Sequence, residues 1–211
     1  MSRSTSAPVP AARRPADASK PRRRADAERS VARILGAAVE ALGDDQDASM
    51  AEIARRAGVV RATIYVHFPT REVLLEAVTA RALAEAAAVI AAAEPARGEP
   101  ADALRRVVGA TWRTLGRYHA LVAINTGADT PEALRHRHGT VLHALAPLIE
   151  RGQTTGAFRA DVPASWHLSM LMALVHAASA EVRAGRIDEH DAEAALVASV
   201  LGAVGADHRR S

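Results

Sequence analysis

The spacing of apolar residues follows the helical period along nearly the whole chain. In residues 28–42, Val31, Ile34, Leu35, Ala38 and Leu42 recur at intervals of three and four, which puts them on one helix face. Similar spacing, with breaks at 94–100 and 154–161, predicts further helices over 49–57, 61–67, 70–93, 101–124, 131–137, 139–152, 163–184 and 189–204. No segment has the alternating pattern of a strand. The sequence therefore predicts an all-α protein.

Residues 49–68 contain local signals that are more specific than a hydrophobic period. Ser49, followed three residues later by Glu52, forms a capping box at the start of a short helix. Gly58 then supplies the backbone geometry of a tight turn. A second short helix follows over 61–67. Short helix, glycine turn and short helix is the order of a helix-turn-helix, whose second helix can enter the major groove of DNA.

These residues strongly resemble the DNA-binding domain of the tetracycline-repressor (TetR) family of bacterial transcription regulators. The resemblance spans roughly residues 27–75 and is carried by Ile53-Ala54, Ala57-Gly58-Val59, Thr63-Ile64-Tyr65, His67-Phe68, Thr70-Arg71-Glu72 and Leu74. It implies an N-terminal three-helix DNA-binding domain over 27–80, followed over 81–211 by a larger helical domain for ligand sensing and dimerisation. It also implies a ligand-responsive homodimeric repressor that binds a palindromic operator through the major groove.

The resemblance assigns DNA contacts to individual residues. Those on phosphates are Ser49, Tyr65, His67 and Arg71, and those on base edges are Arg61, Ala62 and Thr63. Arg61 would donate two hydrogen bonds to a guanine, while Ala62 and the Thr63 methyl would touch thymine methyl groups. Alternatives stay open for three positions: Arg61 as a solvated cation, Tyr65 as a packing ring, and His67 as a cap on the end of its helix.

Two residues depart from the family pattern. Val60 stands where the family usually has a small polar residue, and valine cannot accept the capping hydrogen bond of a helix start. Val66 stands where bulkier or polar residues are common. We therefore expect DNA binding to depend on backbone contacts and on the N-terminal arm. The same departures keep an alternative open, a helical adaptor or sensor of this fold without sequence-specific DNA binding.

Charge is distributed unevenly along the 211 residues, whose net charge is +3. Residues 1–25 hold seven basic side chains and one acid, or +6, so the remainder carries −3. The Ser, Pro and Ala content predicts a disordered basic arm over 1–26. Arginine-rich arms bind phosphate backbones and minor grooves, although a solubilising tail is an equal alternative. The candidate DNA contacts in the arm are Arg13, Arg14, Arg22, Arg23 and Arg24.

The segment over 81–211 contains candidates for an effector pocket and for a dimer interface. Amphipathic side chains in otherwise apolar helices are pocket candidates: Trp112, Tyr118, His119, Asn125, His143 and Met170. Because aromatic residues are few, we expect a small apolar or amphipathic effector rather than a planar cation held in an aromatic cage. The resemblance implies that the last two helices pair between subunits, and an internal core would also explain their Leu168, Leu171, Leu174, Val175, Val182, Leu196, Val200 and Val204.

The sequence lacks the motifs that are typical of several other classes of protein. The chain has no cysteine, which excludes disulfides and thiolate metal sites. His136, His138 and His143 do not share a helix face, so we expect no metal. No glycine-rich phosphate loop or GxSxG motif occurs, and we expect neither an enzyme nor a cofactor. No apolar run approaches the ~20 residues of a membrane helix, so we expect a cytoplasmic protein without membrane association.

Overall fold

The computed structural model describes residues 19–118 and 131–206. The helices in these ranges are α1 (Ser19–Asp44), α2 (Met50–Arg56), α3 (Arg61–His67), α4 (Arg71–Ala92), α5 (Pro100–Leu115), the 3-10 helix η1 (Gly116–Tyr118), α7 (Pro131–Arg137), α8 (Gly139–Thr154), α9 (Ala164–Arg183) and α10 (Glu189–Val204). Apart from one isolated bridge between Phe158 and Gly205, these ranges contain no extended pairing. The predicted all-α fold is confirmed. None of the described helices is long and apolar enough to cross a membrane.

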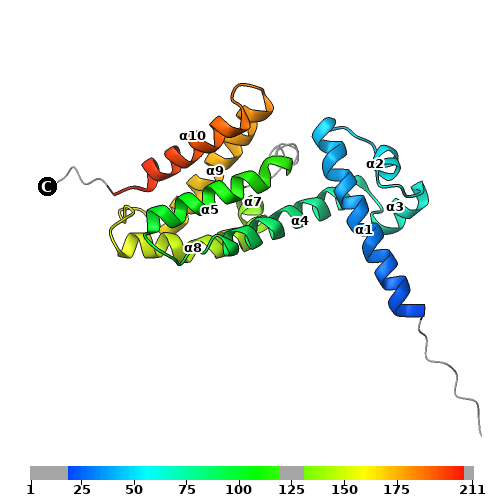
Figure 1. Ribbon diagram of the computed structural model, residues 1–211, viewed down its shortest axis with the longest axis horizontal. Helices are drawn as coiled ribbons and strands as arrows, with labels where there is room; N and C mark the ends of the chain where they lie inside the picture. The colour runs from blue at the N-terminus through cyan, green and yellow to red at the C-terminus, as the bar shows by residue number, and fades with distance from the viewer. Residues whose placement is uncertain (1–18, 119–130, 207–211) are drawn as a thin grey trace, which may run out of the picture.

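The helices form two groups that α4 connects. α1, α2, α3 and the start of α4 form the smaller group, and the rest of α4 packs against α5 and α8 in the larger bundle (Figure 1). Residues 93–99 and 155–163 separate helices, close to the predicted breaks. The helix predicted over 101–124 begins at Pro100 and changes at Gly116 into η1, after which residues 119–130 lie outside the described ranges.

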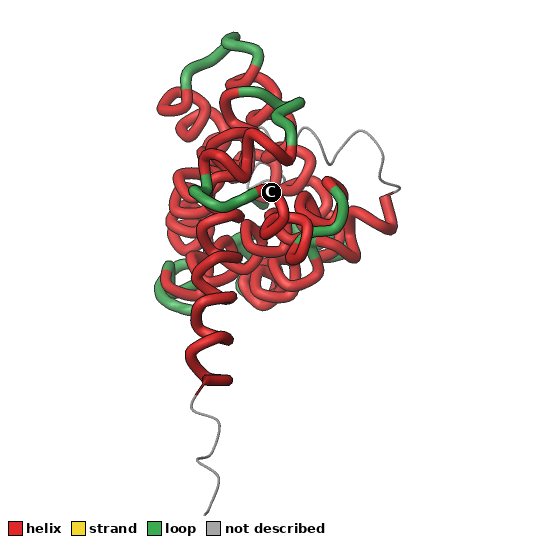
Figure 2. Tube along the Cα trace, turned by 90° about the vertical axis from the view of Figure 1, so that its right-hand side faces the viewer, coloured by secondary structure: helices red, strands yellow, loops and turns green. Residues whose placement is uncertain are grey.

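The first helix begins earlier than the sequence predicted. A start near residue 28 and a disordered arm up to residue 26 were expected, but α1 begins at Ser19. Arginine and alanine favour helix here, and Arg24 pairs with Glu28 one turn later at 3.1 Å. Residues 19–26 therefore extend α1 beyond the other helices (Figures 1 and 2), which corrects the arm's boundary. The predicted contacts Arg13 and Arg14 lie outside the described residues.

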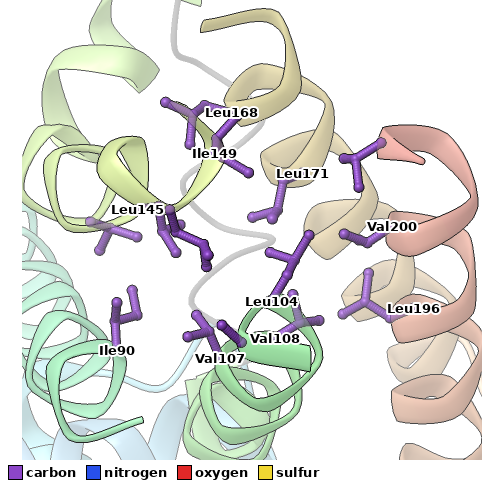
Figure 3. Close-up of a cluster of buried hydrophobic side chains, with 14 of the residues drawn as sticks. Ile90, Leu104, Val107, Val108, Leu145, Ile149, Leu168, Leu171, Leu196 and Val200 are labelled. Atoms are coloured by element: carbon purple, nitrogen blue, oxygen red, sulfur yellow. The ribbon is translucent and has the colours of Figure 1, made fainter. Parts of the chain in front are cut away.

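Each group of helices has its own hydrophobic core. Ile34 of α1, Ile53 of α2, Ile64 of α3 and Leu74 of α4 are fully buried together in the smaller group. In the larger group, side chains from α4, α5, α8, α9 and α10 meet between the helices (Figure 3). Burial of these apolar stripes, which the sequence spacing had located, is what holds the short helices in place.

Several apolar residues of α9 and α10 belong to this internal core. Leu168, Leu171, Leu196, Val200 and Val204 are buried within the single chain. The alternative of an internal core is therefore the right one for these five residues, and they are not available to a second subunit. The faces of α9 and α10 that remain exposed consist of other residues.

Candidate DNA-binding surface and effector cavity

The turn between α2 and α3 is fixed by hydrogen bonds that the sequence predicted in part. The Ser49 hydroxyl accepts from the Glu52 amide at 3.2 Å, which satisfies one free donor at the start of α2. Gly58 has a φ of +62°, a value that favours glycine. The Val59 amide then donates to the Ala54 carbonyl at 3.0 Å and closes the turn. α3 is thereby held against α2 with only Ile64 of its side chains fully buried.

The second half of the expected capping box is replaced by ion pairs. The Glu52 carboxylate accepts from Arg55 at 2.6 and 2.9 Å and from Arg56 at 2.8 Å. Arg56 also pairs with Asp44 at the end of α1, at 2.5 Å. These hydrogen bonds from Arg55 and Arg56 lower the pKa of Glu52 to about 2. Both arginines of α2 are thus neutralised by carboxylates and contribute little net positive charge to the surface.

The exposed face of α3 carries most of the residues expected to read bases. Arg61 and Ala62 in its first turn are exposed, and Thr63 is half-buried. The Arg61 guanidinium lies 5.7 Å from the centre of the Tyr65 ring, a cation–π distance that orients both side chains. Tyr65 is 38% exposed, so its ring is not part of the core. Among the described residues, no carboxylate lies within ion-pair distance of Arg61, which leaves its charge available to DNA.

The two valines that depart from the family pattern are both on the surface of α3. Val60 occupies the N-cap position, makes no side-chain cap hydrogen bond and is 70% exposed. Val66 is 78% exposed. Single exposed apolar side chains are ordinary on a protein surface, so the exposure of the two valines does not by itself mark a contact surface. On a helix that enters a major groove, apolar side chains can touch thymine methyl groups.

Arg71, for which the resemblance implied a phosphate contact, donates hydrogen bonds to two backbone carbonyls. Its guanidinium donates to the Ala48 carbonyl at 3.2 Å and to the Gln46 carbonyl, and its side chain is half-buried. These bonds hold the loop before α2 against the start of α4. The geometry gives Arg71 a structural task in positioning Ser49, whatever further contact its remaining donors make. His67 is half-buried in the last turn of α3, where its ring lies 6.4 Å from that of Phe68.

A mostly apolar cavity lies inside the larger group of helices. The space between its side chains amounts to about 890 Å³, which includes the part open to solvent. α4, α5, η1, the α7–α8 junction, α8 and α9 all contribute to the wall. The lining residues are Thr79, Ala82, Leu83, Ala86, Val107, Val108, Thr111, Trp112, Leu115, Tyr118, Arg137, His138, Val141, Leu145, Leu171, Met172, Val175 and His176.

Two of the six predicted pocket residues lie in this wall. Trp112 and Tyr118 line the cavity, and the Trp112 indole also donates to the Glu189 carbonyl at 3.1 Å. His143 is exposed on α8, and Met170 packs against the hydrophobic core of the larger group. Neither lines the cavity, because each points from a different face of its helix. His119 and Asn125 lie outside the described residues.

Sequence reasoning missed the principal polar residues of the cavity. They are Thr111, Arg137, His138 and His176. His176 could have been found, because it follows Met172 by one turn on the apolar face of α9 that also carries Leu168 and Leu171. Arg137 and His138 could not, because polar residues at a helix junction usually face solvent.

A hydrogen-bonded cluster around Glu85 connects the cavity wall to α1. The Glu85 carboxylate accepts from Arg81 at 3.0 Å, from the Tyr118 hydroxyl at 2.9 Å and from Arg117 at 2.7 Å. Arg81 also donates to the Ala32 carbonyl of α1 at 3.4 Å. Burial raises the pKa of Glu85, but the bonds from Arg81 and Tyr118 outweigh it and the net pKa is lowered. Burial and the neighbouring Glu85 raise the pKa of Tyr118, so the hydroxyl keeps its proton.

Two family models match consecutive parts of the chain. Residues 34–78 match the model described as bacterial regulatory proteins, tetR family. Residues 99–202 match the model described as the C-terminal domain of transcriptional regulators similar to SbtR. The first match covers the helix-turn-helix, and the second covers the helices that enclose the cavity from α5 onward.

Two named regulators are similar in sequence. The transcriptional repressor LfrR of Mycolicibacterium smegmatis is 40% identical over 81 residues, which cover 38% of this chain and 43% of that protein. The chain thus matches less than half of the length of LfrR at this level. The transcriptional regulator NfxB of Pseudomonas aeruginosa is 28% identical over 156 residues, which cover 73% of this chain and 83% of that protein.

Solved structures of such regulators share the fold. The crystal structure of LfrR in complex with proflavine superposes with a TM-score of 0.65 and 26% identity, over 83% of this chain and 97% of that chain. A regulator from a Rhodococcus species superposes with a TM-score of 0.67 and 22% identity, over 84% and 100% of the two chains. With the helix-turn-helix geometry and both family models in agreement, the chain belongs to the TetR family of DNA-binding transcription regulators.

Proposed function

We propose that the protein is a ligand-responsive homodimeric repressor that binds a palindromic operator through the major groove. The observation that carries this proposal is the exposed face of α3, where Arg61 has no carboxylate partner in the described part of the chain and stacks on Tyr65. Residues 27–80 would form the reading domain and residues 81–211 the sensing and dimerising domain. A protein that acts on the chromosome of a bacterium works in the cytoplasm.

The contacts with DNA follow from the exposure of each side chain. Arg61, Ala62 and Thr63 would meet base edges, with Val66 adding an apolar contact. Ser49 and Tyr65 would bind phosphates, and the arm with Arg22, Arg23 and Arg24 would add electrostatic attraction to the backbone. Arg24 is exposed on the projecting start of α1, which supports this role.

A dimer is supported by the exposed faces of α9 and α10. Alanine, serine and glycine dominate there, at Ser169, Ala173 and Ala177 on α9 and at Ala195, Ala198, Ser199 and Gly202 on α10. Trp166 at the start of α9 is 61% exposed. Small side chains allow helices to approach closely, and a C2 dimer would match a palindromic operator.

Coupling between effector and DNA would run through α4. Four side chains of this helix line the cavity: Thr79, Ala82, Leu83 and Ala86. The same helix begins at Arg71, directly after α3, which is the recognition helix of the helix-turn-helix. A small apolar or amphipathic effector that fits best when α4 is tilted would change the separation of the two recognition helices. The required preference for the non-binding state is ~1–3 kcal/mol or more. Binding of proflavine by LfrR supports the view that this fold holds an organic effector.

The experiment that tests DNA binding is retardation of the gene's own upstream region by the purified protein. We expect sequence-preferring binding, and Arg61→Ala should weaken it by ~1–3 kcal/mol because a base contact is lost. Arg105→Ala, which removes an exposed arginine of α5 on the other group of helices, is the matched control and should leave affinity unchanged. Binding without sequence preference would instead favour an adaptor of this fold.

The proposed dimer has its own test in sedimentation equilibrium. Ala198→Arg puts a long charged side chain on the exposed face of α10 and should yield monomers. Ala88→Arg, at an exposed alanine of α4, is the control and should remain dimeric. A dimer that persists in the first variant would contradict the proposed interface.

A further inference from the structure

Three polar side chains gather where α7, α8 and α9 meet at the cavity wall. Arg137 ends α7, and the adjacent His138 occupies the N-cap position of α8. The His138 ring lies edge-on to that of His176 on α9, with 5.6 Å between the ring centres. All three residues line the cavity. An arginine beside two imidazoles places a positive charge and several N–H donors within one small region.

The described part of the same wall carries no acidic side chain. Among the described residues that line the cavity, none is Asp or Glu. Glu85 lies behind the wall, where Arg81, Arg117 and the Tyr118 hydroxyl already occupy its carboxylate. Glu76 lines an adjacent open hollow that Arg137 also borders, not the cavity itself. A cation that enters the cavity loses its hydration, and the described lining residues offer it no carboxylate in return.

The rest of the wall is suited to an apolar body. Apart from three further residues with hydroxyl groups, it consists of Ala, Val, Leu, Met and Trp side chains. One of those hydroxyls, that of Thr111, is buried and has no hydrogen-bond partner within the described residues. A buried polar group without a partner is uncommon in folded proteins and indicates a place where a ligand acceptor can bind.

We infer that the cavity binds an amphipathic organic anion, with its acidic group at Arg137, His138 and His176 and its apolar body among the aliphatic residues of α4, α5 and α9. This inference rests on the proposed role of the cavity as the effector site and adds the charge of the effector. A charge-assisted hydrogen bond from arginine is stronger than a neutral one, so the acidic group supplies selectivity as well as affinity.

The test compares three probes that share one apolar body: decanoate, 1-decanol and decylammonium. Each is titrated into the full-length protein by calorimetry, below the concentration at which it forms micelles. We expect decanoate to bind about tenfold more tightly than decanol, which corresponds to ~1.4 kcal/mol, and decylammonium to bind most weakly. Proflavine serves as a planar cation and should also bind more weakly than decanoate.

Variants assign the preference to the polar region. Arg137→Met should remove the advantage of decanoate over decanol while leaving the affinity for decanol unchanged. Arg137→Lys, which keeps the charge, should retain most of the advantage. The matched control is Arg135→Met, because Arg135 is exposed on the same helix and does not line the cavity. A thermal unfolding scan of each variant establishes that the fold is intact.

The outcomes separate this inference from the proposed function. If decylammonium or proflavine binds most tightly, or if Arg137→Met keeps the preference for decanoate, the inference is overturned. Should decanol nevertheless release DNA from the protein, the ligand-responsive repressor stands without the anion preference. If none of the probes binds, the cavity does not act as an effector site and the inference falls with it, whereas DNA binding is measured independently by retardation.

Discussion

Arg61 and Arg71 illustrate what a single residue's environment adds to its identity. Both matched DNA-contacting positions by resemblance, yet the Arg61 side chain is exposed while that of Arg71 donates to the carbonyls of Gln46 and Ala48. Sequence alone could identify the residue types and the turn at Gly58, because these depend on local chemistry. It could not reveal long-range bonds such as those of Arg71, since partners more than twenty positions apart leave no local pattern.

His176 is the residue whose protonation should be visible in stability. Burial, and then the neighbouring His138, lower its pKa below the ordinary value of 6.5. A lowered pKa in the folded state means that the unfolded chain binds the proton more readily. The contribution of neutral His176 to the free energy of unfolding is therefore fully present above pH 6.5. It is lost as the pH falls from 6.5 through the folded-state pKa of His176.

Equilibrium urea unfolding between about pH 7.5 and 5 tests this. We expect the free energy of unfolding to decline on acidification, and His176→Gln to reduce that decline because the titrating group is gone. His143→Gln removes an exposed histidine of α8 and serves as the control, which should keep the wild-type decline. Parallel curves for His176→Gln and the wild type would contradict the prediction.

The helices differ in how far their boundaries could be read from the sequence. α3 and α7 begin and end where predicted, because Gly58 and Pro69 flank α3 and Pro131 begins α7. α1 begins at Ser19 instead of near residue 28, because its first turns carry no apolar face and are supported by helix propensity and surface ion pairs. The spacing of apolar residues cannot locate a helical segment that buries few apolar side chains.

The missing cap of α3 gives a prediction at the level of one helix. Val60→Ser places a hydroxyl at the N-cap, where it can accept from a free amide of the first turn. We expect the free energy of unfolding to rise by ~0.5–2 kcal/mol in urea titrations. Val66→Ser makes the same chemical change on the same helix without a free amide to satisfy, so it should bring no such gain. Equal effects of both substitutions would rule out capping as the cause.

Across the whole molecule, the excess positive charge and the exposed face of α3 lie in different places. Arg55 and Arg56 are paired with carboxylates, so the smaller group of helices presents little net positive charge beyond Arg61. The excess lies at the N-terminal end of the chain, as composition indicated. The cavity, by contrast, could not be foreseen, because its wall combines residues from α4 to α9 that only the packing brings together.

The role of the N-terminal segment can be measured by salt dependence. Deleting residues 1–18 leaves α1 whole and removes Arg3, Arg13 and Arg14. The slope of log affinity against log salt concentration should become shallower by at least ~0.9, the value for one phosphate contact. A full-length variant with these three arginines changed to glutamine should behave like the deletion. An unchanged slope in both would show that the segment makes no contact with DNA.

Tyr118 limits how segments of this protein can be exchanged with those of its relatives. Its ring is 2% exposed in the core of the smaller group of helices, although it lies more than thirty residues beyond that group in the sequence. The same ring lines the cavity. A chimera joined within α4 would therefore bring a foreign smaller group of helices against a Tyr118 ring that its core is not shaped to receive. One joined after η1 would transfer part of the cavity wall together with the smaller group. The two halves are not interchangeable modules, and a functional graft must take position 118 together with the surface that receives it.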